Sequence, residues 1–161
     1  QVLVLERGTG WDICTFATGE DITAIDISPK MLEQAKPRIE AYDGKIEALL
    51  MDVHDLDFPD NSFDQVFTSC TFCSVPNPVA GLKSLKRVLK PGGTLYMFEH
   101  TGSRFYPFKP MMALMSRLTE NVGPSMSRNT VDNVKNAGFR LLEVNNIFLD
   151  VVKTIKAEKA L

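Results

Sequence analysis

The sequence has no apolar run near the roughly 18 residues that a membrane-spanning helix needs, and no recognisable signal peptide. We therefore expect a cytoplasmic protein. The formal net charge is only −2, which speaks against a polyanionic partner such as nucleic acid. Internal repeats, low-complexity tracts and linkers are also missing, and 161 residues suffice for one domain with a core. The composition thus favours a single globular domain without a polyanionic partner.

Cysteine is scarce. The three residues Cys14, Cys70 and Cys73 make an odd number without a disulfide pattern, which favours a reducing compartment. Cys70 and Cys73 form a C-x-x-C pair, which is typical of a redox site or of half a zinc site. No second pair or histidine cluster accompanies it. We interpret both thiols as small apolar residues at or near a strand end and expect no metal.

Short apolar or β-branched runs alternate with helix-like segments along the chain, which predicts a mostly parallel sheet covered by helices on both faces. The expected strands are 2–5, 22–25, 46–50, 65–69, 94–98, 140–144 and 151–155. The last two are joined by the short link 145–150 and are expected to form an antiparallel hairpin. We predict an α/β fold, Rossmann-like and doubly wound, whose mostly parallel seven-stranded sheet has one antiparallel edge strand.

Helix starts are well marked. Ser28-Pro29 and Asn77-Pro78 each combine a capping side chain with proline at the first helical position. A third helix is expected to start at 129 or 130 and to end before 138. The stretch 91–93, Pro-Gly-Gly, is expected to end the second helix and turn the chain into the next strand. The cations expected on a solvated face of the second helix are Lys83, Lys86, Arg87 and Lys90.

Polar residues and glycines follow several predicted strands, where open α/β sheets bind ligands. Residues 6–10 follow the first strand, Asp26 ends the second, Asp52 follows the third, and Glu99-His100 ends the fifth. Glycine lets the backbone approach a ligand. One carboxylate can accept hydrogen bonds from two ribose hydroxyls, and a second, with a neighbouring N–H, can read the adenine edge. The pattern predicts an adenosine-containing ligand.

In order and spacing, these pieces resemble class I S-adenosylmethionine-dependent methyltransferases of the methyltransferase domain 11 type. The matching stretches, between residues 2 and 100, are GTG at 8–10, ITAIDISPKMLEQAK, MDVHDLDFPDNSFD and LKRVLKPGGTLYMFEH. The stretches CSVPNP and SRNTVDNVKNAGF, with Glu99-His100, resemble small bacterial and archaeal methyltransferases and methyltransferase-like thiol methyltransferases. Ubiquinone/menaquinone and phosphatidylethanolamine methyltransferases are more distant. The resemblance implies one such domain over 1–161 that lacks an N-terminal helical segment and binds S-adenosylmethionine.

The resemblance also implies roles for individual residues. Asp26 is expected to bind the ribose hydroxyls and Asp52 the adenine amino group, with the backbone of Val53 at the ring and Met31 on its face. Gly8 and Gly10 would lie close to the methionine moiety. The further candidate cofactor-binding residues are Glu6, Thr9, Ile27 and Cys70. Each role has a plain alternative: a capping or surface acid for Asp26, one of several loop acids for Asp52, and a core side chain for Met31.

The opening turn departs from the family pattern and allows two registers. One matches Glu6-x-Gly8-x-Gly10 to the family's acid-x-Gly-x-Gly. The other, which the spacing from Gly10 to Asp26 favours, puts Val4 at the acid position and Glu6 at the first glycine. The Glu6 carboxylate would then either contact the methionine ammonium or obstruct the cofactor. The chain is accordingly an active methyltransferase or a catalytically impaired relative with weak or no cofactor binding. A dinucleotide-binding dehydrogenase is a third, weaker alternative.

Methyl transfer from a sulfonium mainly requires that the reacting atoms be held in line, and it needs no metal. His100 is the candidate general base, and its alternative is a hydrogen bond to a neighbouring loop. Residues 103–118 mix aromatic residues, methionines and cations. They form a lid over an apolar substrate, a patch that contacts a membrane surface through 104–117, or a core helix. The expected acceptor is small and lipophilic: a thiol, a quinone or a lipid amine.

Overall fold

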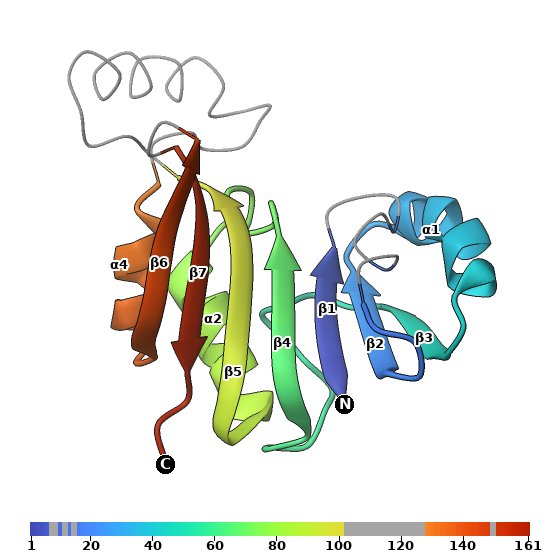
Figure 1. The fold of residues 1–161 in the computed structure, drawn as a ribbon, viewed down its shortest axis with the longest axis horizontal. Coiled ribbons are helices and arrows are strands. Elements are labelled where there is room, and N and C mark those ends of the chain that lie inside the picture. The colour runs from blue at the N-terminus through green and yellow to red at the C-terminus, as the bar shows by residue number, and fades with distance from the viewer. Residues whose placement is uncertain (7–9, 11–12, 14–15, 102–127, 149–150) are drawn as a thin grey trace.

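The computed structural model describes residues 1–6, 10, 13, 16–101, 128–148 and 151–161, which form a seven-stranded sheet with helices packed against it (Figure 1). The strand order across the sheet is β3-β2-β1-β4-β5-β7-β6. The strands are β1 (Val2–Glu6), β2 (Asp21–Asp26), β3 (Lys45–Leu50), β4 (Phe63–Ser69), β5 (Leu89–His100), β6 (Arg140–Phe148) and β7 (Val152–Glu158).

Strand direction agrees with the predicted fold class. The pairs β1–β2, β1–β4, β2–β3 and β4–β5 are parallel, whereas β7 runs antiparallel to both β5 and β6. The reversed strand is therefore β7, within the β7–β6 pair that closes one edge of the sheet. From β1 the chain continues to β2 and β3 on one side, and β4 lies on the other. This reversal of order creates the topological switch point where doubly wound folds bind ligands.

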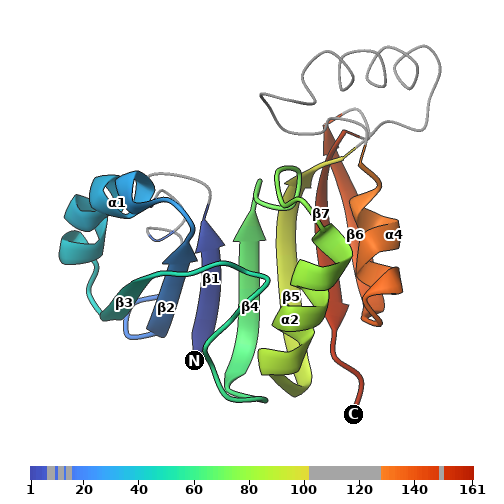
Figure 2. The same cartoon turned by 180° about the vertical axis from the view of Figure 1, so that it is seen from behind.

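Three described helices pack against this sheet: α1 (Pro29–Ala41), α2 (Pro78–Val88) and α4 (Thr130–Asn136). The predicted starts are confirmed, because the Ser28 and Asn77 side chains accept hydrogen bonds from the backbone N–H of Met31 and Ala80. Helices α2 and α4 lie together on one face of the sheet, nearest the viewer in Figure 2. Helix α1 contacts β2 and β3.

The core divides into two clusters because β1 is buried on both of its faces. Leu3 and Leu5 belong to the large cluster that includes the inner faces of α2 and α4. Val2 and Val4 belong to a smaller cluster on the other face of the sheet. Alternate side chains of a strand point to opposite faces, so an apolar run such as VLVL is the sequence of a strand covered twice.

Strand β5 differs from the prediction at its start. It begins at Leu89, directly after α2, and Pro91-Gly92-Gly93 lies inside it rather than in a turn before it. Phe63 pairs with Leu89 before this stretch and Gln65 pairs with Thr94 after it, so the strand carries an irregularity here. Between these two pairs β5 contains more residues than β4. Gly92 accommodates the additional residues with φ +75°, a conformation that costs glycine less than a residue with a side chain.

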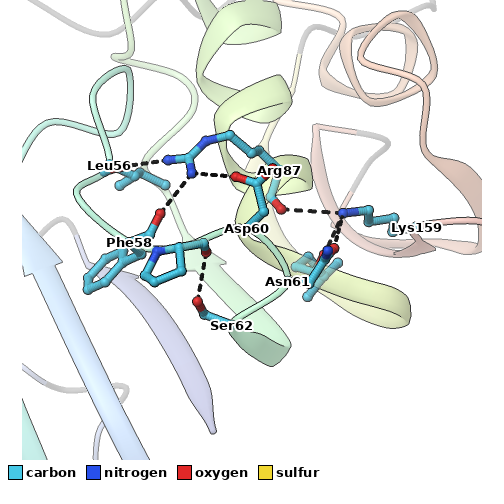
Figure 3. A network of polar contacts seen from close by, with 9 residues as sticks. Leu56, Phe58, Asp60, Asn61, Ser62, Arg87 and Lys159 are labelled. Carbon is cyan, nitrogen blue, oxygen red and sulfur yellow. Dashed lines mark hydrogen bonds and ion pairs between the residues drawn. The ribbon is translucent and has the colours of Figure 1, made fainter.

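The cations near the end of α2 hold neighbouring segments as well as facing solvent. Arg87 donates through Nη1 to the carbonyl of Phe58 (2.7 Å) and to Asp60 Oδ1 (2.8 Å), and through Nη2 to the carbonyl of Leu56 (2.6 Å), as Figure 3 shows. Lys159 donates to Asn61 Oδ1 in the same region. These bonds fix the loop between β3 and β4, whose first residues reach the candidate site.

Candidate functional site

A cavity of about 290 Å³ opens at the carboxyl ends of the parallel strands. Its walls come from the ends of β1 and β2, the start of α1, the loop after β3 and the loop after β4. The lining residues are Leu5, Ile25, Asp26, Ile27, Ser28, Met31, Met51, Asp52, Val53, His54, Thr71, Ser74, Val75 and Pro76. The cavity therefore lies at the switch point beside β1, and it brings together five of the residues predicted to bind the cofactor.

Asp26 ends β2 and leads directly into α1. Its Oδ1 accepts a hydrogen bond from the N–H of Ser28 at 2.7 Å, and its carbonyl accepts one from Met51 at 3.0 Å. The Ser28 hydroxyl in turn caps α1 by accepting from Met31. This sequence of local bonds holds the carboxylate at the cavity wall, next to the positive end of a helix.

Asp52 is held by a residue to which the sequence assigned no role. Its Oδ1 accepts from the backbone N–H of His54 at 2.9 Å and lies 2.7 Å from His54 Nδ1, while His54 Nε2 lies 3.1 Å from the carbonyl of Asn77. The bond from the His54 backbone is the main cause that lowers the pKa of Asp52, and burial opposes it more weakly. Both ring nitrogens of His54 thus face acceptors. Asp52 stays ionised, and its orientation is fixed from the loop and from α2.

The remaining walls are mostly apolar. Met31 and Val53 line the cavity together with Leu5, Ile25 and Val75. A flat aromatic base fits between such side chains, while the carboxylates of Asp26 and Asp52 supply directed polar contacts at its edges. The arrangement suits a nucleoside, which has an apolar ring face, a polar ring edge and a sugar diol.

The turn after β1 is described only in part. Gly10 has φ +79°, and a Cβ added there would lie 3.2 Å from Ala35 Cβ and 3.3 Å from Ile13 Cδ1. Glycine is therefore required where this turn passes α1. Gly8, Thr9 and the side chain of Glu6 lie outside the described residues, so both registers of the turn stay hypotheses.

Cys70 and His100, which are also predicted site residues, do not line the cavity, and neither does Gly10. Cys70 follows β4 with φ +48°, and its N–H donates to the carbonyl of Phe98 at 2.8 Å. His100 ends β5 and pairs with Val152 of β7. The thiol of Cys73 donates to the carbonyl of Cys70, and no group of three His, Cys, Asp or Glu in the described part of the chain could hold a metal ion.

A buried carboxylate stands behind the loop that follows β4. Glu99 is fully buried, and it accepts hydrogen bonds from Thr68 Oγ1 (3.0 Å) and from the backbone N–H groups of Thr71 (3.1 Å) and Phe72 (3.2 Å). Burial raises the pKa of Glu99 to about 7 against the lowering effect of these bonds. The sequence placed Glu99 at a strand end without a role, because only the fold shows which backbone groups meet it.

The described helices include none long and apolar enough to cross a membrane.

Comparisons with known proteins agree with this geometry. The chain is 40% identical over 100 residues to a demethylmenaquinone methyltransferase of Clavibacter sepedonicus, a match that covers 62% of this chain and 40% of that protein. It is 36% identical over 114 residues to a demethylmenaquinone methyltransferase of Bacillus licheniformis, which covers 68% of this chain and 49% of that protein. The chain thus spans less than half the length of these two curated relatives.

Solved structures share the fold. A SAM-dependent methyltransferase from Methanosarcina mazei superposes with a TM-score of 0.78 at 20% identity, over 99% of this chain and 92% of that one. Another from Aquifex aeolicus gives 0.74 at 21% identity, over 99% and 81%. A family model described as "Methyltransferase domain" matches residues 5–97, which include the end of β1, all of β2 to β4, most of β5 and every residue that lines the cavity. By this match, which covers more than half of its length, the chain belongs to that family of methyltransferase domains.

Proposed function

We propose that this chain binds S-adenosylmethionine and transfers its methyl group to a quinone or a comparable small lipophilic acceptor. The observation that carries the proposal is the pair of carboxylates, Asp26 and Asp52, set around one cavity of about 290 Å³ at the switch point of the sheet. The demethylmenaquinone methyltransferases to which the chain is similar support a quinone as the acceptor.

Each of these cavity residues contacts a different part of the adenosine. Asp26 accepts hydrogen bonds from the two ribose hydroxyls, since a carboxylate has two acceptor oxygens. The hydrogen bond from the Ser28 N–H holds the Asp26 carboxylate in place. Asp52 accepts from the adenine amino group, and the backbone of Val53 meets the ring edge. Met31 packs on the ring face. Directed polar contacts at the edges of an apolar cavity fix the orientation of the ligand.

The reaction needs little further chemistry from the protein. S-adenosylmethionine, when bound, supplies a methyl group that its positive sulfur has already activated for in-line displacement. The chain's own residues hold that group in line with the acceptor, and such orientation lowers the barrier. We assign to His100 the removal of the acceptor's proton. His100 ends β5, which runs parallel to β4, β1 and β2 (Figure 1), so it lies at the carboxyl ends of the strands, as Asp26 does.

A lipophilic acceptor also bears on where the protein works. Residues 104–117 lie outside the described residues, and their mixture of aromatic, methionine and cationic side chains supports peripheral contact with a membrane that holds the acceptor. Cys70 and Cys73 are thiols, which agrees with a reducing compartment such as the cytoplasm.

Titration with S-adenosylhomocysteine by calorimetry tests the proposal. The variant Asp26→Asn keeps an oxygen for the Ser28 N–H but loses the charge that the ribose hydroxyls meet, so its Kd should rise at least about tenfold. Asp21→Asn is the matched control, because Asp21 begins the same strand at the opposite edge of the sheet and is exposed. Equal affinities of wild type and Asp26→Asn would refute the assignment of Asp26. A wild-type protein that releases no heat at millimolar ligand would refute cofactor binding.

A further inference from the structure

The loop between β4 and α2, residues 70–77, forms one wall of the cavity through Thr71, Ser74, Val75 and Pro76. We infer that Glu99 and Arg128 are positioning residues that hold this loop against the cofactor from two sides. Neither residue lines the cavity. The inference rests on the proposed function, because the bound cofactor is what the loop would be positioned to meet.

Glu99 holds the loop by accepting hydrogen bonds from backbone N–H groups of the loop. Its Oε1 accepts from Thr71 N at 3.1 Å and Phe72 N at 3.3 Å, and its Oε2 accepts from Phe72 N at 3.2 Å. Thr68, at the end of β4, donates to the same carboxylate and is itself fully buried. The carboxylate therefore ties the start of the loop to β4 and β5, out of contact with water.

Arg128 holds the same loop by donating hydrogen bonds to backbone carbonyl groups of the loop. Its Nη1 donates to the carbonyl of Phe72 at 3.1 Å and to that of Val75. Arg128 directly precedes Asn129, the residue that caps α4. The loop is thus fixed to α4 on one side and to β5 on the other, and Phe72 takes part in both attachments: its N–H meets the anion and its C=O meets the cation.

Of the three anchored residues, Thr71 and Val75 also line the cavity. Thr71 gives its N–H to Glu99 and its hydroxyl to the carbonyls of Leu5 (3.2 Å) and Ser69 (3.0 Å). The carbonyl of Val75 accepts a hydrogen bond from Arg128 Nη1. Cys70, which opens the loop, has φ +48°, a conformation that is uncommon for a residue other than glycine. Loss of either anchor would move the wall that faces Asp26 and Asp52.

Burying a carboxylate costs free energy, so it is an unfavourable way to stabilise a fold. Burial raises the pKa of Glu99 to about 7, so ionisation of this group is opposed by its surroundings. The loop N–H groups nevertheless require an acceptor, and an ionised carboxylate is the stronger one. The other charged or titratable groups on the segments around Glu99 are Lys153, opposite it on β7 and hydrogen-bonded to Asn146, the neighbouring His100 on β5, the thiols of Cys70 and Cys73 in the loop, and Arg128. We therefore expect the grip on the loop to strengthen as Glu99 ionises.

The test measures the affinity for S-adenosylhomocysteine of the wild type, Glu99→Gln, Arg128→Met and Arg128→Lys. We expect the Kd to rise about tenfold in Glu99→Gln and Arg128→Met and less in Arg128→Lys, with the double variant falling short of the product of the single effects. Glu47→Gln on β3 and Lys135→Met on α4 are the matched controls, since both side chains are exposed, and their Kd should stay within twofold.

Two further readouts separate positioning from a merely structural role. The affinity for S-adenosylhomocysteine should rise between pH 6 and pH 8 in the wild type, by a factor at least three times the factor found for Glu99→Gln. Amide hydrogen exchange at Thr71 and Phe72 should speed up in Glu99→Gln relative to exchange in the middle of β4, which reports the global stability of each protein. If Glu99→Gln does not fold, the Arg128 variants and the wild-type pH profile decide.

Each outcome bears on one hypothesis. Folded variants that bind with wild-type affinity and the wild-type pH profile would overturn the inference. A wild type that does not bind S-adenosylhomocysteine would reject the proposed function instead. In that case exchange at Thr71 and Phe72 still tests the attachment of the loop, because unchanged exchange in Glu99→Gln would show that the carboxylate does not hold it.

Discussion

For the acidic residues near the carboxyl ends of the strands, the surroundings of each carboxyl group determine its pKa. Asp52 leaves 43% of its side chain exposed and accepts two contacts from His54, and its pKa is lowered. Glu99 is fully buried, and its pKa is raised to about 7 although it accepts several hydrogen bonds. Desolvation outweighs hydrogen bonding only where water is excluded. The two carboxyls therefore respond differently to pH.

Stability should accordingly depend on pH through Glu99. The folded protein keeps the proton of Glu99 up to pH about 7, whereas the unfolded chain releases it near the ordinary value of 4.5. Between these values the folded state binds more protons, so the free energy of unfolding falls as pH rises and is constant above about 7. We expect the wild type to lose about 3 kcal/mol relative to Glu99→Gln between pH 4.5 and pH 7.5.

Urea denaturation of both proteins across this pH range measures the effect. The comparison removes the contribution of every other titrating group, because both proteins share them. A difference between wild type and Glu99→Gln that does not change with pH would contradict the raised pKa of Glu99.

The placement of residues at or just after a strand end could be predicted from the sequence. Asp26, Asp52 and Val53 meet at the cavity because parallel strands bring their carboxyl ends to one edge. His54 and Arg128 could not be predicted, since their contacts join residues that are far apart in the chain: 23 positions from His54 to Asn77, and 56 from Arg128 to Phe72. No local pattern encodes such contacts.

At the scale of elements, the same distinction separates helix starts from strand limits. The starts of α1 and α2 were predictable because a capping side chain followed by proline acts within one turn. The start of β5 was not, because the pairing of Leu89 with Phe63 draws the Pro-Gly-Gly stretch into the sheet. Likewise β6 extends to Phe148, since β7 pairs with it beyond the predicted end.

The end of α2 makes a prediction that belongs to this scale. Arg87→Met removes a guanidinium that donates to two loop carbonyls and to Asp60, and methionine keeps most of the side chain's length. Hydrogen bonds from charged groups contribute more than neutral ones, but Arg87 is 39% exposed, so we expect a loss of about 1–2 kcal/mol. Arg87→Lys should recover little, because an ammonium lacks the fork that reaches both carbonyls.

Lys83→Met is the control for this measurement. Lys83 lies on the same helix and is exposed, and its replacement should change the free energy of unfolding by less than about 0.5 kcal/mol. Urea denaturation at 25 °C compares the variants. Equal losses in Lys83→Met and Arg87→Met would show that the loop bonds of Arg87 do not contribute to stability.

At the scale of the whole molecule, the two faces of the sheet differ in how many apolar side chains they bury. The large cluster joins β1, β4, β5 and β7 to the inner sides of α2 and α4, and it includes residues of the loop that lines the cavity, among them Phe72 and Val75. The smaller cluster comprises Val2, Val4 and Ile22 with a few partly buried neighbours. The site thus depends on the same core that stabilises most of the fold.

A cavity in the large cluster should therefore weaken the molecule as one unit. Leu85 is fully buried on α2, so Leu85→Ala should lower the free energy of unfolding by about 2–5 kcal/mol. Leu142→Ala is the matched control: the same side chain on β6 is 45% exposed, and its loss should cost less than about 1 kcal/mol. Since Leu85 packs in the cluster that carries the loop, exchange at the Phe72 amide should speed up in Leu85→Ala by the same free energy as global unfolding, with the dependence on urea unchanged. A Phe72 amide that keeps its wild-type protection in a globally destabilised Leu85→Ala would contradict this coupling, because the loop would then open independently of the core beneath it.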